Sequence, residues 1–318
     1  MCMESLTKNR QNKNIIEAIV QKFFPNNSLS SYTELKEGFF NAAYEIRLDN
    51  NREMVLKVAP KKGTRIMTYE KNIMQSEIYA MQKINNISDI PAPRLLGADM
   101  SCTICESGYF LMEKLEGDSL NSIKSQLTDA QVNDIYYHMG QINRRINEID
   151  CPHFGYPGQV EFQGDSWYDV FRRMLSAGIS DAEKGNVDLI ISTNQLMEKL
   201  QKDKRIFDEV TQPKLVHWDC WDGNIFVKDA AITGIIDWER CLWADPLMEV
   251  GFRTYDDNAV FLKGYNIKQL SEHQWRRAIW YDIYLMILVS LECEYRKYDT
   301  LEMYEWSTGV LQKQFKQL

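Results

Sequence analysis

Hydrophobic and polar residues follow two kinds of periodicity in the first 115 positions. Between Asn14 and Phe24 the apolar residues recur with helical spacing, and the run stops at Pro25, which predicts a helix. A second helix is predicted from Tyr69 to Ile84. Short apolar or alternating runs bounded by turn residues predict strands near residues 32–35, 42–48, 54–59, 94–99 and 108–113.

The pattern becomes mostly helical after Gly117. Thr128 and Gln131 form a capping box, and the apolar stripe that follows keeps helical spacing. A strand–loop–strand unit is predicted from Lys214 to Asp237. Further helices are predicted over residues 166–178, 193–210, 245–254, 272–297 and 300–315.

This order of elements predicts an α+β fold with two lobes. A small β-rich N-terminal lobe would take residues 1–115, and a larger, mostly helical lobe would take residues 116–318. The chain has 318 residues, of which 44% are hydrophobic, so it is long enough to bury a sizeable core. A nucleotide-sized ligand would bind in the cleft between the lobes.

Charge and hydropathy argue against two classes of partner. The net charge of -8 does not suit an extended nucleic-acid footprint. The most apolar run, Ile283–Leu291, is too short to cross a bilayer and is flanked by Asp282 and Glu292. The polar segment Met1–Asn14 lacks the apolar core of a secretory signal. We therefore expect neither a nucleic-acid nor a membrane partner.

The seven cysteines show no spacing typical of a disulfide framework. Cys102 and Cys105 form a C-x-x-C pair, but no second pair of Cys or His residues completes a zinc site. We interpret the pair as small apolar residues near a strand turn. Free thiols predict a reducing, cytoplasmic location.

The strand–loop–strand unit carries the residues best suited to chemistry. His217 and Asp219 precede Asn224 in the loop, and Asp237 follows the next strand, so the polar side chains would gather at one mouth. Phosphoryl transfer needs an oriented acceptor hydroxyl, clamped phosphates and metal that neutralises developing charge. An Asp can orient the acceptor, while Asn and Asp are oxygen ligands for Mg²⁺. The alternative is a plain turn centred on Asp222-Gly223.

These residues resemble the signature of the aminoglycoside phosphotransferase and choline kinase family, distant relatives of the protein kinases. The family's motifs read here His217-Trp-Asp219-Cys-Trp-Asp-Gly-Asn224, Ile236-Asp237-Trp238-Glu239 and Ala244-Asp245-Pro246-Leu-Met-Glu249. The resemblance implies a two-lobed protein-kinase-like fold. It also implies that Asp219 is the catalytic base, that Asn224 and Asp237 hold magnesium, and that His217 braces the loop.

Lys57 lies within an otherwise apolar strand, Val55–Val58, where its burial is unfavourable unless the charge is paired. In kinases this Lys contacts the nucleotide phosphates and pairs with a Glu on the next helix. Glu77 is the favoured partner because apolar helical positions surround it, and Glu70 is the competing choice. If the strand is an edge, the ammonium would instead reach water.

Two further segments resemble the nucleotide site of kinases. Gly38 lies between the first two predicted strands, in the place of the Gly-rich loop, although the G-x-G-x-x-G pattern is absent. Phe110–Gly117 resembles the hinge between lobes. Backbone groups of Glu113 and Leu115 would then meet the adenine, with Met112 at the back of the pocket. An ordinary strand end before a turn is the alternative.

The expected activity is transfer of the γ-phosphate of ATP or GTP, with Mg²⁺, to a hydroxyl of a small and possibly cationic molecule. Within this class an aminoglycoside-like antibiotic is favoured over choline, an amino alcohol or a sugar. A catalytically inactive nucleotide-binding relative is the alternative from another class. A protein kinase fits less well, because Asp-Trp-Glu replaces Asp-Phe-Gly and no Ala-Pro-Glu element occurs. The sequence does not indicate an oligomeric state.

The predicted helical lobe is rich in aromatic residues, whose rings can cage a quaternary ammonium; they include Trp167, Trp243, Trp275, Trp280, Trp306, Tyr281 and Tyr284. However, Trp280, Tyr281 and Tyr284 have the helical spacing of core residues. We therefore favour core packing over a cage. The acceptor-binding residues themselves are not identified by any motif.

Overall fold

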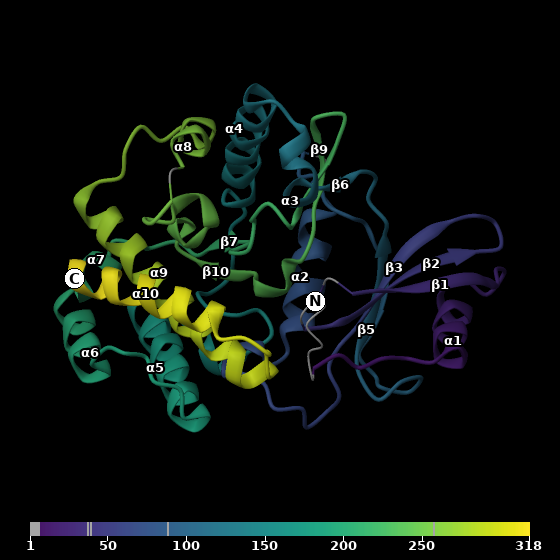
Figure 1. Ribbon diagram of the computed structural model, residues 1–318, viewed down its shortest axis with the longest axis horizontal. Coiled ribbons are helices and arrows are strands. Elements are labelled where there is room, and N and C mark those ends of the chain that lie inside the picture. The colour runs from purple at the N-terminus through teal and green to yellow at the C-terminus, as the bar shows by residue number, and fades with distance from the viewer. Residues whose placement is uncertain (1–6, 37, 39, 88, 257) are drawn as a thin grey trace.

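The computed structural model describes residues 7–36, 38, 40–87, 89–256 and 258–318. An antiparallel sheet with its two helices forms a small portion at one side, and most of the helices form a larger portion at the other (Figure 1). This arrangement agrees with the predicted α+β class. The predicted division between residues 115 and 116 falls in the connection between the fifth and sixth strands, and we keep it as a proposal.

The sheet of the small portion has the strand order β1-β2-β3-β5-β4, and its pairs are all antiparallel. The strands are β1 Leu29–Leu35, β2 Ala42–Leu48, β3 Glu53–Val58, β4 Leu95–Asp99 and β5 Tyr109–Glu113. Side chains alternate between faces along each strand. Apolar residues of β2, β3 and β5 therefore pack on one face against helix α1 (Lys13–Phe23).

Lys57 projects from the opposite face of β3. Lys57 pairs with Phe110 of β5. Two pairs further along the strands, on the same face, Val55 pairs with Met112. Both β5 residues pack in the core cluster that contains Met81 of helix α2 (Ile73–Ile84). The alternation of β3 thus directs one cation toward α2 while the hydrophobic residues on either side of it face α1.

The helix predicted from Tyr69 to Ile84 is divided in two. A 3₁₀ turn, η1, covers Thr68–Glu70, and α2 begins only at Ile73. Asn72 adopts a left-handed conformation, φ 54° and ψ 22°, which stops the first turn before the second begins. Glu70 and Glu77 consequently belong to different elements, and this difference decides which of them can reach Lys57.

The larger portion is mainly helical. Its helices are α3 Leu120–Ile123, α4 Asp129–Ile146, α5 Trp167–Gly185, α6 Thr193–Lys202, α7 Lys204–Phe207, α8 Ala259–Tyr265, α9 Glu272–Arg296 and α10 Glu302–Gln317. Its 3₁₀ turns are η2 Lys124–Gln126, η3 Val160–Phe162, η4 Trp238–Arg240, η5 Pro246–Met248 and η6 Val250–Phe252. The helices α9 and α10 lie side by side (Figure 1).

Helix α9 is the centre of the larger core. Trp280, Tyr281 and Tyr284 are almost fully buried among residues of α5 and α7, so the core interpretation of these aromatics is confirmed and the cage interpretation is wrong for them. Their polar atoms are bonded, as when Tyr281 donates to Asp245 at 2.7 Å. None of the described helices has the length and hydrophobicity needed to span a membrane.

Two predicted helices of the larger portion are wrong in detail. The helix expected over 193–210 breaks at Asp203, whose carboxylate accepts hydrogen bonds from Arg276 at 2.6 Å and Trp280 at 2.9 Å on α9. The segment 245–254 forms η5 and η6 with an extended residue, Glu249, between them. Tertiary contacts outweigh local propensity at both places.

Short strands position the predicted catalytic segment. The strand β7 (Lys214–Val216) pairs with β10 (Leu242–Ala244), while β6 (Asp118–Ser119), β8 (Ile225–Lys228) and β9 (Ala231–Ile235) form a second small sheet. The loop between β7 and β8 and the end of β9 thereby come together, since Ile236 N–H donates to the Asn224 carbonyl at 3.0 Å.

Candidate active site

His217 fixes the backbone of the loop between β7 and β8. Its ring is fully buried, with Nδ1 3.2 Å from the Asp219 amide and Nε2 3.0 Å from the Ile236 carbonyl. Nδ1 must accept the first bond, so the ring is neutral and carries its proton on Nε2. Burial lowers the pKa of His217 from 6.5 to about 4, so the ring stays neutral at ordinary pH. The ring therefore ties the loop to the end of β9.

A buried carboxylate secures the loop from behind. Glu249 accepts hydrogen bonds from the backbone amides of His217 at 2.9 Å and Trp218 at 3.0 Å, and from the Asn147 side chain at 3.1 Å. Trp218 has a positive φ of 67°, which costs energy for a bulky residue and persists because its surroundings impose it. The motif that contains Glu249 did not predict this role. A lone acid between Met248 and Val250 is the sequence feature that indicates a buried, bonded carboxylate.

Asp219 projects from this loop toward Arg240 and Asn224. The Asn224 amide donates to the Asp219 carbonyl at 2.8 Å and to its carboxylate at 3.1 Å, and the Arg240 guanidinium lies 3.6 Å from the other carboxylate oxygen. Burial raises the pKa of Asp219 to about 6, with Arg240 opposing the rise. A carboxylate in this position can accept a hydroxyl proton more readily than an ordinary Asp.

Lys57 joins two acidic residues from different elements. Its Nζ lies 2.6 Å from Glu77 Oε1 on α2 and 2.7 Å from Asp237 Oδ1 after β9. Burial opposes the charge, but Asp237 and Glu77 outweigh it and hold the pKa of Lys57 above its usual value. The structure therefore brings together the Lys and Glu predicted to pair, and adds the predicted metal ligand to them.

The acidic residues around Lys57 fit a hard divalent cation. Carboxylate oxygens of Glu77, Asp237 and Glu239 all lie within 4.8 Å of one another. Asp237 adopts φ 65° and ψ 57°, and the N–H of the preceding residue, Ile236, donates to the backbone carbonyl of Asn224. The side-chain nitrogen of Asn224 donates to Asp219, which leaves the side-chain oxygen of Asn224 for coordination. Clustered carboxylate and amide oxygens are the donor set that Mg²⁺ prefers.

Glu239 was not predicted as a site residue. Its carboxylate accepts a hydrogen bond from Asn41 at 2.8 Å, and burial together with Asp237 raises its pKa well above the usual value. Asn41 precedes β2, so this contact connects the strand–turn region of the sheet to the metal-binding segment. An acid two residues after a predicted ligand is the sequence signal that points to Glu239.

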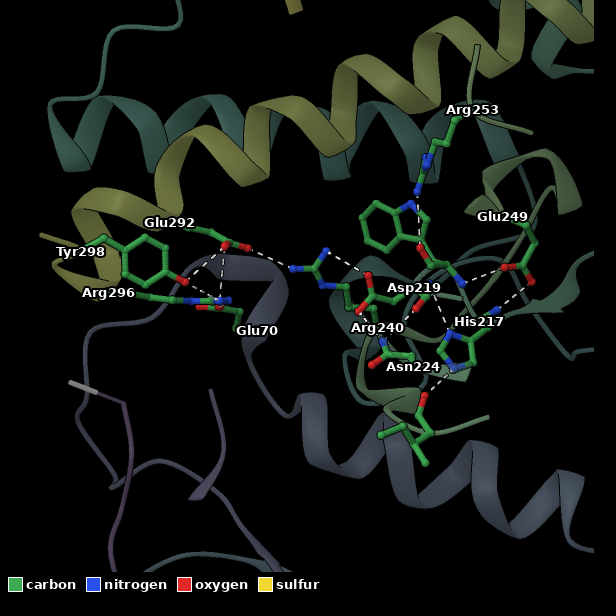
Figure 2. A network of polar contacts seen from close by, with 12 residues as sticks. Glu70, His217, Asp219, Asn224, Arg240, Glu249, Arg253, Glu292, Arg296 and Tyr298 are labelled. Carbon is green, nitrogen blue, oxygen red and sulfur yellow. Dashed lines mark hydrogen bonds and ion pairs between the residues drawn. The ribbon is translucent and has the colours of Figure 1, made fainter. Parts of the chain in front are cut away.

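Glu70 does not reach Lys57. Its carboxylate instead binds Arg296 of α9 at 2.8 Å. Arg296 also contacts Glu292, which in turn binds Arg240 beside Asp219 (Figure 2). The competing choice of Glu70 as the partner of Lys57 is therefore wrong, because the break at Asn72 directs it toward the larger portion.

A cavity of about 770 Å³ opens beside Asp219. Its walls come from the loop after β7, the segment after η6, and helix α10. Aromatic, acidic and basic side chains line it, among them Trp221, Tyr255, Trp306, Asp256, Glu305, Arg253 and Lys313. The sequence did not identify them as a set because three separate segments contribute them. Of the aromatic residues considered for a cage, Trp306 is the one that lines this cavity.

These features match one protein family. A sequence profile described as the phosphotransferase enzyme family matches residues 31–279. The chain belongs to this family. The match covers the sheet, the catalytic loop and most of the helical portion, and the resemblance inferred from the motifs is confirmed.

Individual relatives of this phosphotransferase family member are distant. A probable ketoamine kinase of Enterococcus faecium is 24% identical over 232 residues, which cover 69% of this chain and 70% of that protein. A subtelomeric hrmA-associated cluster protein of Aspergillus fumigatus is 29% identical over 124 residues, or 38% of this chain. The match covers 23% of that fungal protein, so the chain spans about a quarter of the first curated relatives it matches.

The fold is that of aminoglycoside kinases. The structure of a thermostable aminoglycoside phosphotransferase APH(4)-Ia mutant in ternary complex with ADP and hygromycin B superposes with a TM-score of 0.65 at 16% identity. The superposition covers 95% of this chain and 98% of that one. The predicted two-lobed, protein-kinase-like fold is thereby confirmed for this member of the family.

The residues predicted to contact the nucleotide lie around the junction of the two portions. Glu113 ends β5, and its N–H donates to the Arg94 carbonyl at 2.9 Å. The Leu115 side chain packs closely on Gly234 of β9. Gly38 is exposed, and its neighbours Glu37 and Phe39 lie outside the described residues. Nucleotide binding by these residues stays a prediction.

Proposed function

We propose that this phosphotransferase transfers the γ-phosphate of ATP or GTP to a hydroxyl of a small cationic acceptor, with an aminoglycoside-like molecule favoured. One observation carries the proposal. Asp219 faces the 770 Å³ cavity. Its loop is hydrogen-bonded to the end of β9, where Asp237 contacts Lys57, the partner of Glu77. An acceptor in the cavity would thus meet a base on one side and the phosphate-binding residues on the other.

In the proposed mechanism Asp219 orients the acceptor hydroxyl and takes its proton as the bond to phosphorus forms. Lys57 contacts the nucleotide phosphates and is held in position by Glu77. Asn224 and Asp237 would hold Mg²⁺, which when bound neutralises charge on the phosphates. The bonds from His217 and Glu249 keep the loop rigid, and that rigidity preserves the geometry of Asp219.

We further propose that the nucleotide binds under Gly38 and against the chain at Glu113 and Leu115. Support comes from their positions between the sheet and β9, where Leu115 contacts Gly234. ATP is favoured as donor because the superposed aminoglycoside phosphotransferase contains ADP. A cytoplasmic location is kept as part of this proposal, and the cysteines of the described segments are free thiols, consistent with it.

The composition of the cavity supports a cationic acceptor. Asp256 and Glu305 supply carboxylates near its mouth, while Trp221 and Trp306 offer ring faces that suit sugar or cationic groups. Two cationic residues, Arg253 and Lys313, also line the cavity. The Arg253 guanidinium is directed toward Asp282 at 3.6 Å and the Trp218 carbonyl at 3.3 Å, and the carboxylates of Asp219, Asp256 and Glu305 outnumber the remaining lysine. The superposed aminoglycoside phosphotransferase is in complex with hygromycin B, which belongs to the same chemical class as the acceptor proposed here.

A second candidate is a metabolic kinase for a sugar amine. It is favoured by the similarity to a probable ketoamine kinase, which covers about seven-tenths of both chains. Aminoglycosides and ketoamines share a hydroxylated sugar that carries an amine, so both fit a cavity with carboxylates and ring faces. Choline and simple amino alcohols would leave most of a 770 Å³ cavity unfilled.

An inactive nucleotide-binding relative is the remaining alternative. Lys57, Asp219, Asn224 and Asp237 are all present and lie in linked positions, which argues for catalysis. The deciding experiment is a phosphoryl-acceptor screen with labelled ATP and GTP across aminoglycosides, ketoamines, choline, ethanolamine and sugars. Transfer to a sugar amine supports the proposal. The inactive relative would be favoured if the protein binds nucleotide but shows neither transfer nor any hydrolysis that is weaker in Asp219→Ala.

A further inference from the structure

Five charged side chains of alternating sign form a line from the catalytic loop to the small portion (Figure 2). Arg240 lies 3.6 Å from Asp219 and 3.0 Å from Glu292. Arg296 lies 3.4 Å from Glu292 and 2.8 Å from Glu70. Side-chain exposure falls along the line from 22% at Asp219 to 2% at Glu70.

Glu292 is the central member of this line. One of its carboxylate oxygens binds Arg240 and the other contacts Arg296, so Glu292 shares each guanidinium with a second carboxylate, that of Asp219 or Glu70. A buried ion costs several kcal/mol unless it is paired and hydrogen-bonded. Loss of the Glu292 charge would remove the nearer of the two carboxylates that hold Arg240, and the guanidinium would be free to change its position relative to Asp219.

The backbone around Glu292 is rigid. Glu292 and Arg296 are one turn apart on α9, whose deep burial fixes its register against α5. Arg240 belongs to η4, three residues after Asp237. Glu70 is itself fixed, because its second oxygen accepts the Met67 amide at 2.7 Å. Glu292, Arg296 and Glu70 are therefore anchored by structure that does not belong to the catalytic loop.

We infer that Glu292 is a positioning residue for phosphoryl transfer: it holds Arg240 so that the guanidinium stays beside Asp219 and orients the base. Arg296 and Glu70 extend this support to the small portion. The inference rests on the proposed function, because it assigns a role relative to the base of that reaction. It predicts an effect on turnover and on the order of the loop, with little effect on nucleotide affinity.

The test compares Glu292→Gln with Glu294→Gln. Glu294 lies two residues further along α9 and pairs at the surface with Arg65 and Lys297, so it controls for loss of a helix carboxylate. We expect Glu292→Gln to lower kcat about 10- to 100-fold, as for a small misplacement of a catalytic group, with KM for nucleotide changed less than about twofold. Glu294→Gln should match the wild type. Equal kcat in the two variants would overturn the inference.

A second comparison tests whether Glu292 acts through Arg240. In an Arg240→Gln background, Glu292→Gln should lower kcat less than about twofold further, since both changes remove one interaction. Independent, multiplying losses would overturn the inference. Glu292→Asp keeps the charge but is one methylene shorter, and we expect it to restore part of kcat. It also provides a folded variant if Glu292→Gln does not fold.

Hydrogen exchange of the loop, residues 217–224, gives a readout that does not require activity. We expect faster exchange in Glu292→Gln, with wild-type exchange in Glu294→Gln. Uniformly faster exchange over the whole chain would indicate a merely structural role and overturn the inference. If the wild type transfers phosphate to no acceptor, the proposed function fails. The exchange comparison then still decides whether Glu292 orders the loop.

Discussion

The Oδ1 atom of Asp237 lies 2.7 Å from Nζ of Lys57, although 180 residues separate the two along the chain. Lys57 belongs to the sheet and Asp237 follows a strand of the larger portion. The contact therefore joins the cation proposed to bind phosphate and a proposed metal ligand across the junction of the two portions. Glu77 completes the pairing at 2.6 Å from the same ammonium.

Lys57→Met should lose stability and nucleotide response together. The change leaves the buried Glu77 and the partly buried Asp237 without their cation, and loss of one partner of a buried ion pair costs about 3–5 kcal/mol. We expect the urea-unfolding free energy to fall by about 3 kcal/mol and the thermal stabilisation by ATP and magnesium to disappear. Lys61→Met, at an exposed position just beyond β3, is the control and should change neither. An unchanged ATP response in Lys57→Met would remove this residue from the nucleotide site.

Asp219→Asn should separate binding from chemistry. Asn keeps the shape of the side chain but cannot accept the hydroxyl proton, so turnover should fall by about 10²–10⁴-fold while nucleotide affinity stays within about threefold. Steady-state transfer and calorimetric nucleotide binding measure the two effects. Asp222→Asn, in the same loop but bonded to Lys124 and Tyr136, is the matched control. Near-wild-type turnover in Asp219→Asn would disprove the assignment of the base.

Much of the fold was predictable because local periodicity reflects the packing of each element. The strands of the sheet and the helix 272–297 were placed to within a few residues, since alternation and a long buried helix leave strong signals. The breaks at Asn72 and Asp203 were not predicted. Each depends on a backbone conformation or a side-chain bond to a distant element, which no local pattern encodes.

The site shows the same division. Asp219, Asn224 and Asp237 were identified because motif and strand spacing place them in one short segment. Glu249 and Glu292 were assigned no role, although a lone acid in an apolar run demands a buried partner. The partner of such an acid lies on a distant element, and the sequence does not say which one. The cavity residues come from three segments, so they become a set only in the folded chain.

Asp237→Ala should remove the magnesium dependence of nucleotide binding. The variant loses a central member of the acidic cluster that also contains Glu77 and Glu239. We expect the nucleotide affinity of the variant to be the same with and without magnesium, whereas magnesium should strengthen binding by the wild type at least tenfold, roughly 1.4 kcal/mol. Isothermal titration with ATP in magnesium and in EDTA measures this. Asp229→Ala, in the turn between β8 and β9, is the control. A variant with the full magnesium effect would exclude Asp237 as a ligand.

Stability should depend on pH through His217. Burial lowers the pKa of this ring from 6.5 to about 4, so the unfolded chain binds its proton more readily than the folded one. The contribution to stability is therefore full above pH 6.5 and is lost as pH falls toward 4, by roughly 3 kcal/mol. Asp219 and Asp282, whose pKa values burial raises to about 6, act in the opposite direction. The difference between wild type and His217→Gln isolates the contribution of the ring.

Urea unfolding of both proteins between pH 4 and 7 measures this contribution. The stability advantage of the wild type over His217→Gln should shrink steadily as the pH falls from 6.5. His138→Gln, an exposed change on α4, should parallel the wild type at every pH. A pH-independent difference between wild type and His217→Gln would mean that the ring is not held neutral in the folded protein.

Trp306→Ala should weaken acceptor binding without altering the chemical step. Trp306 is 48% exposed on α10, lines the cavity beside Asp219 and meets the Tyr255 ring edge-on at 6.3 Å. Loss of a ring contact worth about 1 kcal/mol should raise KM for the acceptor about fivefold, with kcat and KM for nucleotide little changed. Trp275→Ala removes an equally exposed indole, 45%, from α9 outside the cavity and should leave all three constants unchanged. If both variants behave like the wild type, the acceptor does not use this wall of the cavity, and the aromatic face has no part in its recognition.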